Sequence, residues 1–226
     1  MNKLLFTALA LLPITFFFTV GTNEKTRFSI VDIAEKSMVQ INDNCSGVVV
    51  DAEKGLVATA NHCIYRNPNG IVKMEFFGKN EDGSYSKEAR YGSVVCTSKY
   101  KDIAIVKVPG GLKGKIAVPF AKETPAVGTV VYAIGNPVGW ESFVTKGVIS
   151  NNYYLWTKDM YDGIAYHTGL ASYVSDVVIA GGSSGGPLVN EDGELLGLTN
   201  WRNDYANLTL ITPFDGVEKE MKRCSA

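Results

Sequence analysis

Histidine, cysteine and net charge are all scarce in this sequence. It holds 2 histidines and 4 cysteines in 226 residues, with no Cys-x-x-Cys pair and no histidine cluster, so the sequence predicts no metal site. Its 22 Lys and Arg residues nearly balance its 23 Asp and Glu residues, and no dense basic stretch indicates nucleic-acid binding. Long helical periods and internal repeats are also absent, which excludes helical bundles and solenoids. We expect neither a cofactor nor a nucleic-acid partner.

Charged residues are missing from residues 4–20, directly after Lys3. This is the profile of a secretory signal peptide, although no clear small-x-small cleavage site ends it. The 17 residues also lie at the lower limit for a helix that spans a membrane. Residues 1–22 are therefore interpreted as a signal peptide or as an uncleaved anchor that attaches the chain to a membrane through residues 4–20, with a buried helix as the third alternative. The first two options place the remaining chain outside the cytoplasm, secreted or periplasmic.

The remaining chain has the pattern of many short strands joined by turns. β-Branched runs flank a turn that contains glycine at residues 46–60, which predicts a hairpin. Further strands are expected at 71–77, 91–95, 103–108, 130–134, 144–149, 164–167, 177–179, 188–189 and 195–201. The aromatic run at 153–156 is interpreted as packing inside a barrel. This pattern predicts an all-β double barrel.

Only the end of the chain has helical character. Thr212 is suited to cap a helix, Pro213 to occupy its first position and Asp215 to lie in its first turn. We therefore expect a short C-terminal helix.

Glycines crowd around one serine, in the stretch Gly-Gly-Ser-Ser-Gly-Gly-Pro at residues 181–187. Glycine reaches backbone dihedrals that a Cβ forbids, so such a turn holds one side chain exposed and aims consecutive N–H groups at one point. A serine nucleophile with an oxyanion hole needs this arrangement. The alternative is an ordinary glycine-rich hairpin loop, and a base with an orienting carboxylate upstream decides between the two.

The search for a base is short because only His62 and His167 are available. His62 follows a predicted strand, whereas His167 lies inside a strand-like run and is interpreted as a structural histidine. Asp102 opens an apolar strand that has no other carboxylate, a place where burial needs compensation. The order His62, Asp102, Ser184 is one of the known chain orders of a Ser-His-Asp triad.

Several stretches together resemble the trypsin-like serine peptidases, and among these the HtrA/Deg branch. They are Ser46–Val50 with Ala58–His62, Asp102–Lys107, Ala133–Gly139, Thr145–Ser150, Asp176–Ile179 and Gly182–Val189. The resemblance implies two packed six-stranded antiparallel β-barrels of chymotrypsin type, with the site between them. We expect the peptidase domain at residues 28–226, with its barrels at about 28–118 and 119–212 and its helix at 213–224. The PDZ domain that commonly follows in this branch is not recognised.

The resemblance also implies the roles of the site residues. Ser184 is expected to be the nucleophile rather than Ser183, because the reactive serine of the family directly precedes Gly-Gly-Pro. His62 then acts as the base and Asp102 orients its ring. The N–H groups of Gly182 and Ser184 form the oxyanion hole. In trypsin-like zymogens an aspartate at the position of Ser183 pairs with a newly cut N-terminus, so we expect no activation of that kind here.

The resemblance places the substrate-binding residues on both sides of the nucleophile. Val178 falls at the base of the primary pocket, where trypsin has an aspartate, so a preference for Lys or Arg is not expected. Thr199, Asn200 and Trp201 form the strand that pairs with the substrate backbone, and Arg202 stands where a glycine would leave the pocket open. We predict cleavage after a small or medium aliphatic residue, and recognition of an acidic side chain by Arg202 is the alternative.

The four cysteines, Cys45, Cys63, Cys96 and Cys224, allow three pairings. The resemblance favours a bridge between Cys45 and Cys63, next to the base. Cys96 and Cys224 are then left to form a second bridge, which would attach the final helix to the first barrel, or to remain buried thiols.

Taken together, the sequence predicts an exported serine endopeptidase that acts on polypeptides through His62, Asp102 and Ser184 and needs no cofactor. The alternative is a catalytically inactive relative that binds polypeptides in the same groove. The oligomeric state cannot be inferred from the sequence.

Overall fold

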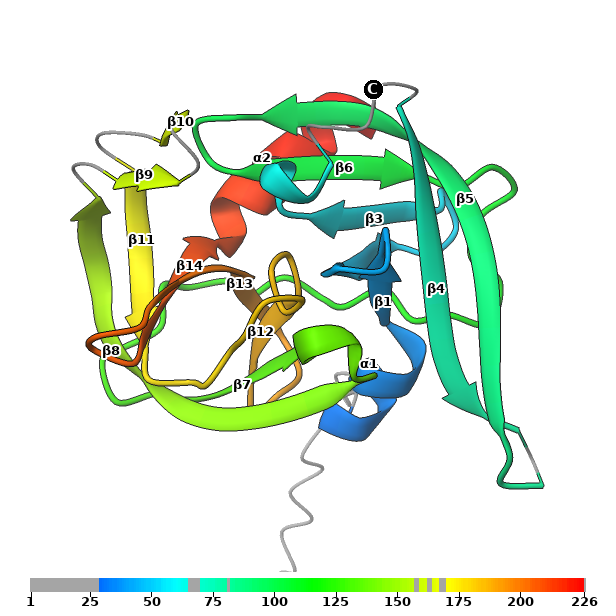
Figure 1. Cartoon of the computed structure of the whole chain (residues 1–226), viewed down its shortest axis with the longest axis horizontal. Coiled ribbons are helices and arrows are strands. Elements are labelled where there is room, and N and C mark those ends of the chain that lie inside the picture. The colour runs from blue at the N-terminus through cyan, green and yellow to red at the C-terminus, as the bar shows by residue number, and fades with distance from the viewer. Residues whose placement is uncertain are drawn as a thin grey trace, which may run out of the picture.

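Two closed antiparallel barrels of six strands each lie side by side in the computed structural model, which describes residues 29–64, 70–80, 82–156, 159–161, 164–166 and 170–225 (Figure 1). The first barrel has the strand order β1-β2-β3-β6-β5-β4 and follows a short helix. Its elements are α1 (Ile30–Lys36), β1 (Met38–Ile41), β2 (Cys45–Asp51), β3 (Leu56–Thr59), a 3-10 turn (Asn61–Cys63), β4 (Ile71–Lys79), β5 (Tyr85–Ser98) and β6 (Ile103–Lys107).

The second barrel has the strand order β11-β14-β13-β12-β7-β8. Its strands are β7 (Val130–Gly135), β8 (Phe143–Trp156), β11 (Leu170–Ser175), β12 (Pro187–Asn190), β13 (Leu195–Asn203) and β14 (Leu208–Pro213), with a 3-10 turn (Pro137–Gly139) after β7. A separate two-stranded sheet joins β9 (Asp159–Tyr161) to β10 (Ile164–Tyr166), and the helix α2 (Phe214–Ser225) ends the described chain. The expected all-β double barrel with a short C-terminal helix is confirmed.

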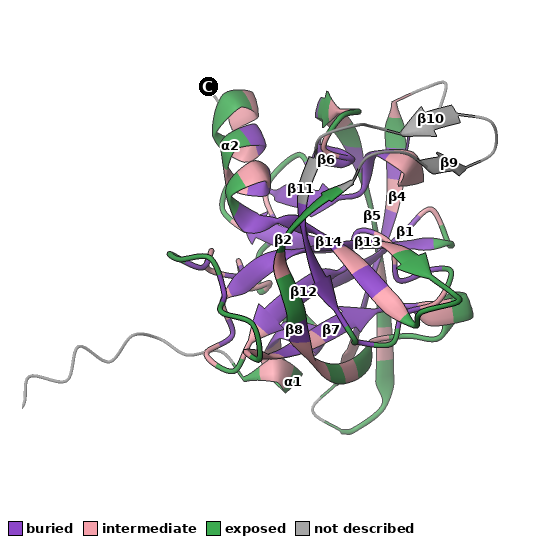
Figure 2. Cartoon of the chain, turned by 90° about the vertical axis from the view of Figure 1, so that its left-hand side faces the viewer, coloured by how far each residue is buried: buried purple, intermediate pink, exposed green. Residues whose placement is uncertain are grey.

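The strands of the first barrel that face the second barrel are apolar on both sides. In β6, Ala104 and Val106 point into the first barrel, whereas Ile103 and Ile105 join a cluster that includes Leu195 of β13. Successive side chains of a strand point to opposite faces, so an uninterrupted apolar run is buried on both. Figure 2 shows the result as a continuous buried interior. This shared cluster holds the two barrels together and so fixes how the two sides of the cleft between them face each other.

The structure adds elements that the sequence analysis did not predict, namely α1, β1, β9, β11 and β14. It also corrects the strand predicted at residues 177–179, which lie outside the strands. The carbonyls of these residues are bonded by side chains: Thr209 Oγ1 donates to Val177 (2.8 Å), Thr145 Oγ1 to Val178 (2.8 Å) and Arg202 Nη1 to Ile179 (2.7 Å). Side-chain donors therefore bind the carbonyls that the N–H groups of a neighbouring strand would bind in a β-sheet.

Two further interpretations are wrong in detail. Tyr153, Tyr154 and Leu155 are exposed on β8 rather than packed inside the barrel. Thr212 is not the helix cap, because it lies in β14 and its hydroxyl donates to the Lys101 carbonyl at 3.1 Å. The predicted leader at residues 1–22 and His167 lie outside the described residues. In the described part of the chain, no helix has the length and hydropathy of a membrane span.

Two disulfides connect the four cysteines. Cys45 of β2 is bonded to Cys63, 18 residues away, in the turn that carries His62. Cys96 of β5 is bonded to Cys224 of α2, 128 residues away. The second bridge attaches the C-terminal helix to the first barrel, although the helix directly follows the last strand of the second barrel.

We predict that the two disulfides stabilise the chain unequally. Because the loss of chain entropy grows with loop length, the Cys96→Ala/Cys224→Ala variant is expected to lower the free energy of unfolding by up to about 5 kcal/mol, against up to about 3 kcal/mol for Cys45→Ala/Cys63→Ala. Denaturant titrations under non-reducing conditions measure both differences. A larger loss from the shorter loop would contradict this account.

Candidate active site

A cleft of about 340 Å³ lies between the barrels. His62 contributes to it from the first barrel, and Ser184, Asn200, Trp201 and Arg202 contribute from the second. The indole ring of Trp201 lies 4.9 Å from the His62 ring, centre to centre, at a tilt of 38°. Five predicted site residues therefore line this cleft. They are His62, Ser184, Asn200, Trp201 and Arg202.

Asp102 lies beneath His62 and contacts it twice. Its Oδ1 accepts the backbone N–H of His62 at 2.8 Å, and its Oδ2 lies 2.7 Å from the ring Nδ1. Asp102 is only 4% exposed, so its carboxylate needs these donors. An ionised carboxylate only accepts hydrogen bonds, so the proton of the neutral ring belongs on Nδ1 and the Nε2 lone pair is free. The pair therefore presents His62 as a base.

The conformation of Asp102 is unusual, with φ at +53°. Asn200 of β13 binds its backbone, because Nδ2 donates to the Asp102 carbonyl at 3.1 Å. The same amide group donates to Thr212 Oγ1 at 2.7 Å. The second barrel thus supports the residue of the first barrel that contacts His62.

Ser184 lies in the glycine-rich turn, which approaches its neighbours too closely for side chains. A Cβ at Gly182, Gly185 or Gly186 would overlap the carbonyl oxygens of Asn136, Ser46 or Ile134, respectively. Gly182 and Gly185 also have φ values of +103° and +83°, which favour glycine. The Ser184 hydroxyl donates to the Asn200 carbonyl at 3.3 Å. The sequence pattern is therefore explained by backbone packed against backbone of both barrels.

Two peptide carbonyls of this turn are held by the second barrel. The Gly181 carbonyl accepts the N–H of Val138 at 2.6 Å. The Ser183 carbonyl accepts the hydroxyl of Thr199 at 2.9 Å. These bonds fix the orientation of the two peptide planes.

The N–H groups on the opposite sides of these planes belong to Gly182 and Ser184. In a trans peptide the N–H points away from the carbonyl of the same plane. Within the described chain neither N–H donates a hydrogen bond. The turn thus offers two N–H donors beside the Ser184 hydroxyl, which is the requirement for an oxyanion hole.

Ser183 is turned away from the cleft. It is 5% exposed, its hydroxyl accepts the Ala180 N–H at 3.4 Å, and it packs against Gly135. Only Ser184 of the two serines lines the cleft. This placement agrees with the choice of Ser184 as the reactive serine.

The structure separates the residues assigned to substrate binding. Arg202 lines the cleft, and its guanidinium donates to the Ile179 carbonyl (2.7 Å) and to Asn207 Oδ1 (3.0 Å) and pairs with Asp204 (3.2 Å). Val178 is 62% exposed and, within the described chain, lines a separate small cavity with Ile179 and Thr199 rather than the cleft. Its neighbour Ile179 also lines the cleft.

Two groups of side chains have donor atoms close enough to hold a metal. They are Cys45, His62 and Cys63, and Cys96, Glu220 and Cys224. In both groups the sulfurs are joined as disulfides. Thiolates are the metal-binding form of cysteine, so the donor sets do not suit a metal in this state.

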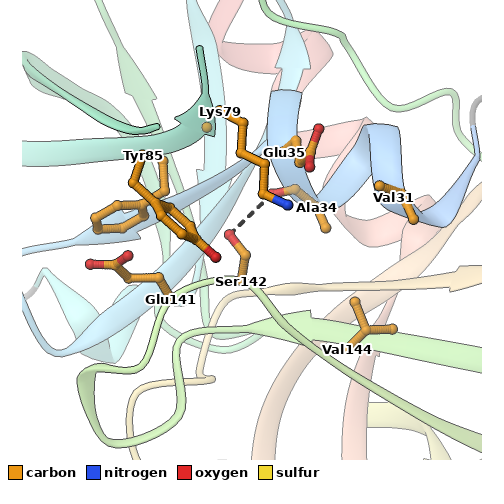
Figure 3. Close-up of a pocket in the computed structure, with 10 residues that line it drawn as sticks. Val31, Ala34, Glu35, Lys79, Tyr85, Glu141, Ser142 and Val144 are labelled. Atoms are coloured by element: carbon orange, nitrogen blue, oxygen red, sulfur yellow. Dashed lines mark hydrogen bonds between the residues drawn. The ribbon is translucent and has the colours of Figure 1, made fainter. Parts of the chain in front are cut away.

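A second cavity, of about 410 Å³, lies apart from these residues (Figure 3). It is formed by α1, the β4–β5 hairpin and residues 141–144. In Figure 3 the Ser142 hydroxyl reaches Ala34 of α1, donating to its carbonyl at 3.2 Å.

Sequence reasoning did not identify Ser46, Asn136 and Val138 as residues that contact the glycine-rich turn at residues 181–187. Ser46 and Asn136 are almost fully buried polar residues that contact the glycine-rich turn. Both belong to stretches that carried the family resemblance, so the signal was present in the sequence. Their partners are far away in the chain and became visible only in the fold.

Comparisons with known proteins agree with this geometry. Residues 45–198 match the family described as trypsin-like peptidase domain. Serine endoprotease DegS of Salmonella typhimurium is 30% identical over 190 residues, which are 79% of this chain and 47% of that protein. A probable periplasmic serine endoprotease, DegP-like, of Pseudomonas putida (strain W619) is 30% identical over 79% of this chain and 34% of its own length. The chain thus spans half or less of these relatives.

A solved structure shares the fold. The serine endoprotease from Yersinia pestis superposes with a TM-score of 0.66 at 24% identity, covering 86% of this chain and 65% of that one.

We predict that Gly185→Ala destabilises the chain by about 3 kcal/mol, because the new Cβ would overlap Ser46 O, Thr59 Oγ1 and Ala60 N at a positive φ. Gly181→Ala is the matched control, since a Cβ there meets nothing within 4 Å. Urea titrations of both variants test the prediction. Equal stability of the two would show that the close approach at Gly185 is not required.

Proposed function

The chain belongs to the trypsin-like peptidase family, and we propose that it is an exported serine endopeptidase that cleaves polypeptides through His62, Asp102 and Ser184. The observation that carries the proposal is the double contact of Asp102 with His62, at 2.8 and 2.7 Å, beside a cleft that Ser184 also lines. This contact sets the tautomer in which the ring accepts a proton.

In the acylation step, Ser184 Oγ bonds to the carbonyl carbon of the substrate and its proton passes to His62 Nε2. The electron pair of the C=O bond moves onto the carbonyl oxygen, which the N–H groups of Gly182 and Ser184 bind. Each such donor is worth about 3 kcal/mol in well-studied cases. Collapse of this intermediate breaks the C–N bond, and His62 gives its proton to the leaving amine.

In the deacylation step, water repeats the attack on the acyl-enzyme. His62 takes a proton from the water, and the oxyanion forms again at the same two N–H groups. The bond between the acyl carbon and Ser184 Oγ then breaks, and His62 returns its proton to the serine. The chain's own residues thus supply every proton transfer, with water as the only co-reactant.

We propose a preference for small or medium aliphatic residues on the acyl side of the cleaved bond. Among the described residues that line the cleft, Arg202 and Asp204 carry charge, and they pair with each other at 3.2 Å. Arg202 also donates from Nη1 to Ile179 O and from Nη2 to Asn207 Oδ1, so an acidic substrate side chain would compete with three protein partners for the guanidinium. Ile179 and Ala180 leave an apolar surface in the same cleft.

The proposal includes an extracytoplasmic location. Disulfides persist in oxidising compartments, and the chain contains two. The printed name of the Pseudomonas putida relative places that protein in the periplasm. Residues 1–22 would serve as the signal peptide or membrane anchor, and residues 28–226 as the peptidase domain.

A second candidate function is binding of polypeptides without cleavage. The observation that favours it is the Ser184 hydroxyl, which donates to Asn200 O at 3.3 Å rather than to the base. A rotation of one side chain redirects this hydroxyl, whereas the bonds that orient His62 are already made. We therefore prefer the catalytic function.

The first test is covalent labelling. A fluorophosphonate probe is expected to bond to Ser184 Oγ with loss of fluoride, and peptide mapping should locate the label on Ser184 and not on Ser183. His62→Ala should slow labelling more than about 1,000-fold because the base is lost. A wild-type chain that folds but is never labelled would support the binding function instead.

The second test is the cleavage profile of the wild-type chain on a peptide library, with Ser184→Ala as the inactive control. We expect cleavage after Val, Ala, Leu or Ile. Cleavage chiefly after Asp or Glu would mean that Arg202 leaves its partners to bind substrate, and cleavage chiefly after Lys or Arg would overturn the assignment of the pocket.

A further inference from the structure

The glycine-rich turn at residues 181–187, called the nucleophile turn below, has no charged residue that could hold it in place through an ion pair. The position before Ser184 is Ser183, whose side chain is uncharged and 5% exposed. The N–H groups of Gly182 and Ser184 donate no hydrogen bond within the described chain, so no bond of their own fixes the direction in which they point. Other contacts must therefore restrain its peptide planes.

Ser46 of β2 supplies the contact to the middle of the turn. Its hydroxyl donates to the Gly182 carbonyl at 2.7 Å and accepts from the backbone N–H of Asn136 (2.9 Å) and from Asn136 Nδ2 (3.2 Å). A hydroxyl has one proton and two lone pairs, so all its capacity is used. Ser46 is 0% and Asn136 1% exposed, so water does not compete for these bonds.

The same hydroxyl also restrains the segment that holds the neighbouring peptide plane. Asn136 lies two residues before Val138, whose N–H donates to the Gly181 carbonyl and thereby orients the Gly182 N–H. Val138 has φ at +47°, a rare conformation for a β-branched residue, which persists only where surrounding contacts impose it. Fixing Asn136 therefore helps to fix Val138.

The contacts of Asn136 extend outward to α1. Its Oδ1 accepts the N–H of Ser142 at 3.1 Å, and Ser142 reaches the Ala34 carbonyl across the cavity of Figure 3. The restraint on the turn therefore draws on three separate parts of the fold: β2, the segment after β7, and α1.

We propose that Ser46, through Asn136, is a positioning residue that keeps the oxyanion hole assembled in place of an ion pair. This inference rests on the proposed function. The Ser46 hydroxyl ties the Gly182 carbonyl and the 136–138 segment to the first barrel, so the Gly182 N–H stays directed into the cleft. Ser46 does not touch the substrate.

The test compares Ser46→Ala with Ser37→Ala. Ser37 is also 0% exposed, and its hydroxyl also donates to a backbone carbonyl at 2.7 Å, that of Ile116, which is outside the nucleophile turn. Ser37→Ala removes one hydrogen bond and Ser46→Ala removes three, so Ser46→Ala should lower thermal stability more, and labelling is compared at a temperature at which both variants remain folded. Ser46→Ala alone should slow fluorophosphonate labelling by about 10- to 100-fold, a fraction of what a whole oxyanion donor provides.

Kinetics on a cleaved peptide provide the readout that a merely structural role would not move. For Ser46→Ala we expect kcat to fall with KM unchanged, because only the transition state uses the oxyanion hole. Ser46→Cys has a somewhat larger side chain and offers only a weak donor, so it should give an intermediate rate and replaces Ser46→Ala if that variant does not fold.

The outcomes separate the two levels of the argument. A wild-type chain that is not labelled refutes the proposed function itself. A labelled wild type with Ser46→Ala reacting as fast as Ser37→Ala, or with Ser46→Cys reacting at the wild-type rate, refutes the positioning role alone.

Discussion

The close approach of one glycine-rich turn to the backbone of both barrels is the constraint on which the site depends. Gly182 and Gly186 pack against carbonyls from the end of β7, and Gly185 packs against the carbonyl of Ser46 in β2. No side chain separates these backbones, so the position of Ser184 is set by main-chain contacts that allow little adjustment. The same contacts require the barrels to sit at one distance from each other. The shared apolar cluster, with Ile105 and Leu195 among its members, holds them there.

Much of the fold followed from local patterns in the sequence. The apolar run at residues 103–106 is a strand whose two faces pack against two different apolar clusters. The hairpin at residues 46–60 has β-branched strands on both sides of a turn. Elements whose pattern is weak were missed, such as β1 and α1. The segment 177–179 has the composition of a strand but is bonded by side chains of Thr209, Thr145 and Arg202, which no local pattern reveals.

Some residues of the candidate site could also be inferred from the sequence, whereas others could not. Ser184, His62 and Asp102 were inferred because a nucleophile, a base and a carboxylate are recognisable residue types in a recognisable order, and the structure places His62 and Asp102 in contact. Val178 was assigned to the primary pocket by counting back from Ser184, and that assignment stays a prediction, since Val178 lines a small cavity beside Ile179 while Ile179 also lines the cleft. The role proposed for Ser46 depends on a partner 136 residues away, so it could be inferred only from the fold.

The bridge from Cys96 to Cys224 closes a covalent ring that contains the whole second barrel. The chain leaves the first barrel after β6 and returns to it through α2, so the second barrel is tethered at both of its ends. If thermal motion separates the faces that carry His62 and Ser184, the covalent links at both ends of the second barrel limit how far the faces can move apart. The disulfide therefore adds a second covalent link to the chain connection between the barrels and raises the effective concentration of one half at the other.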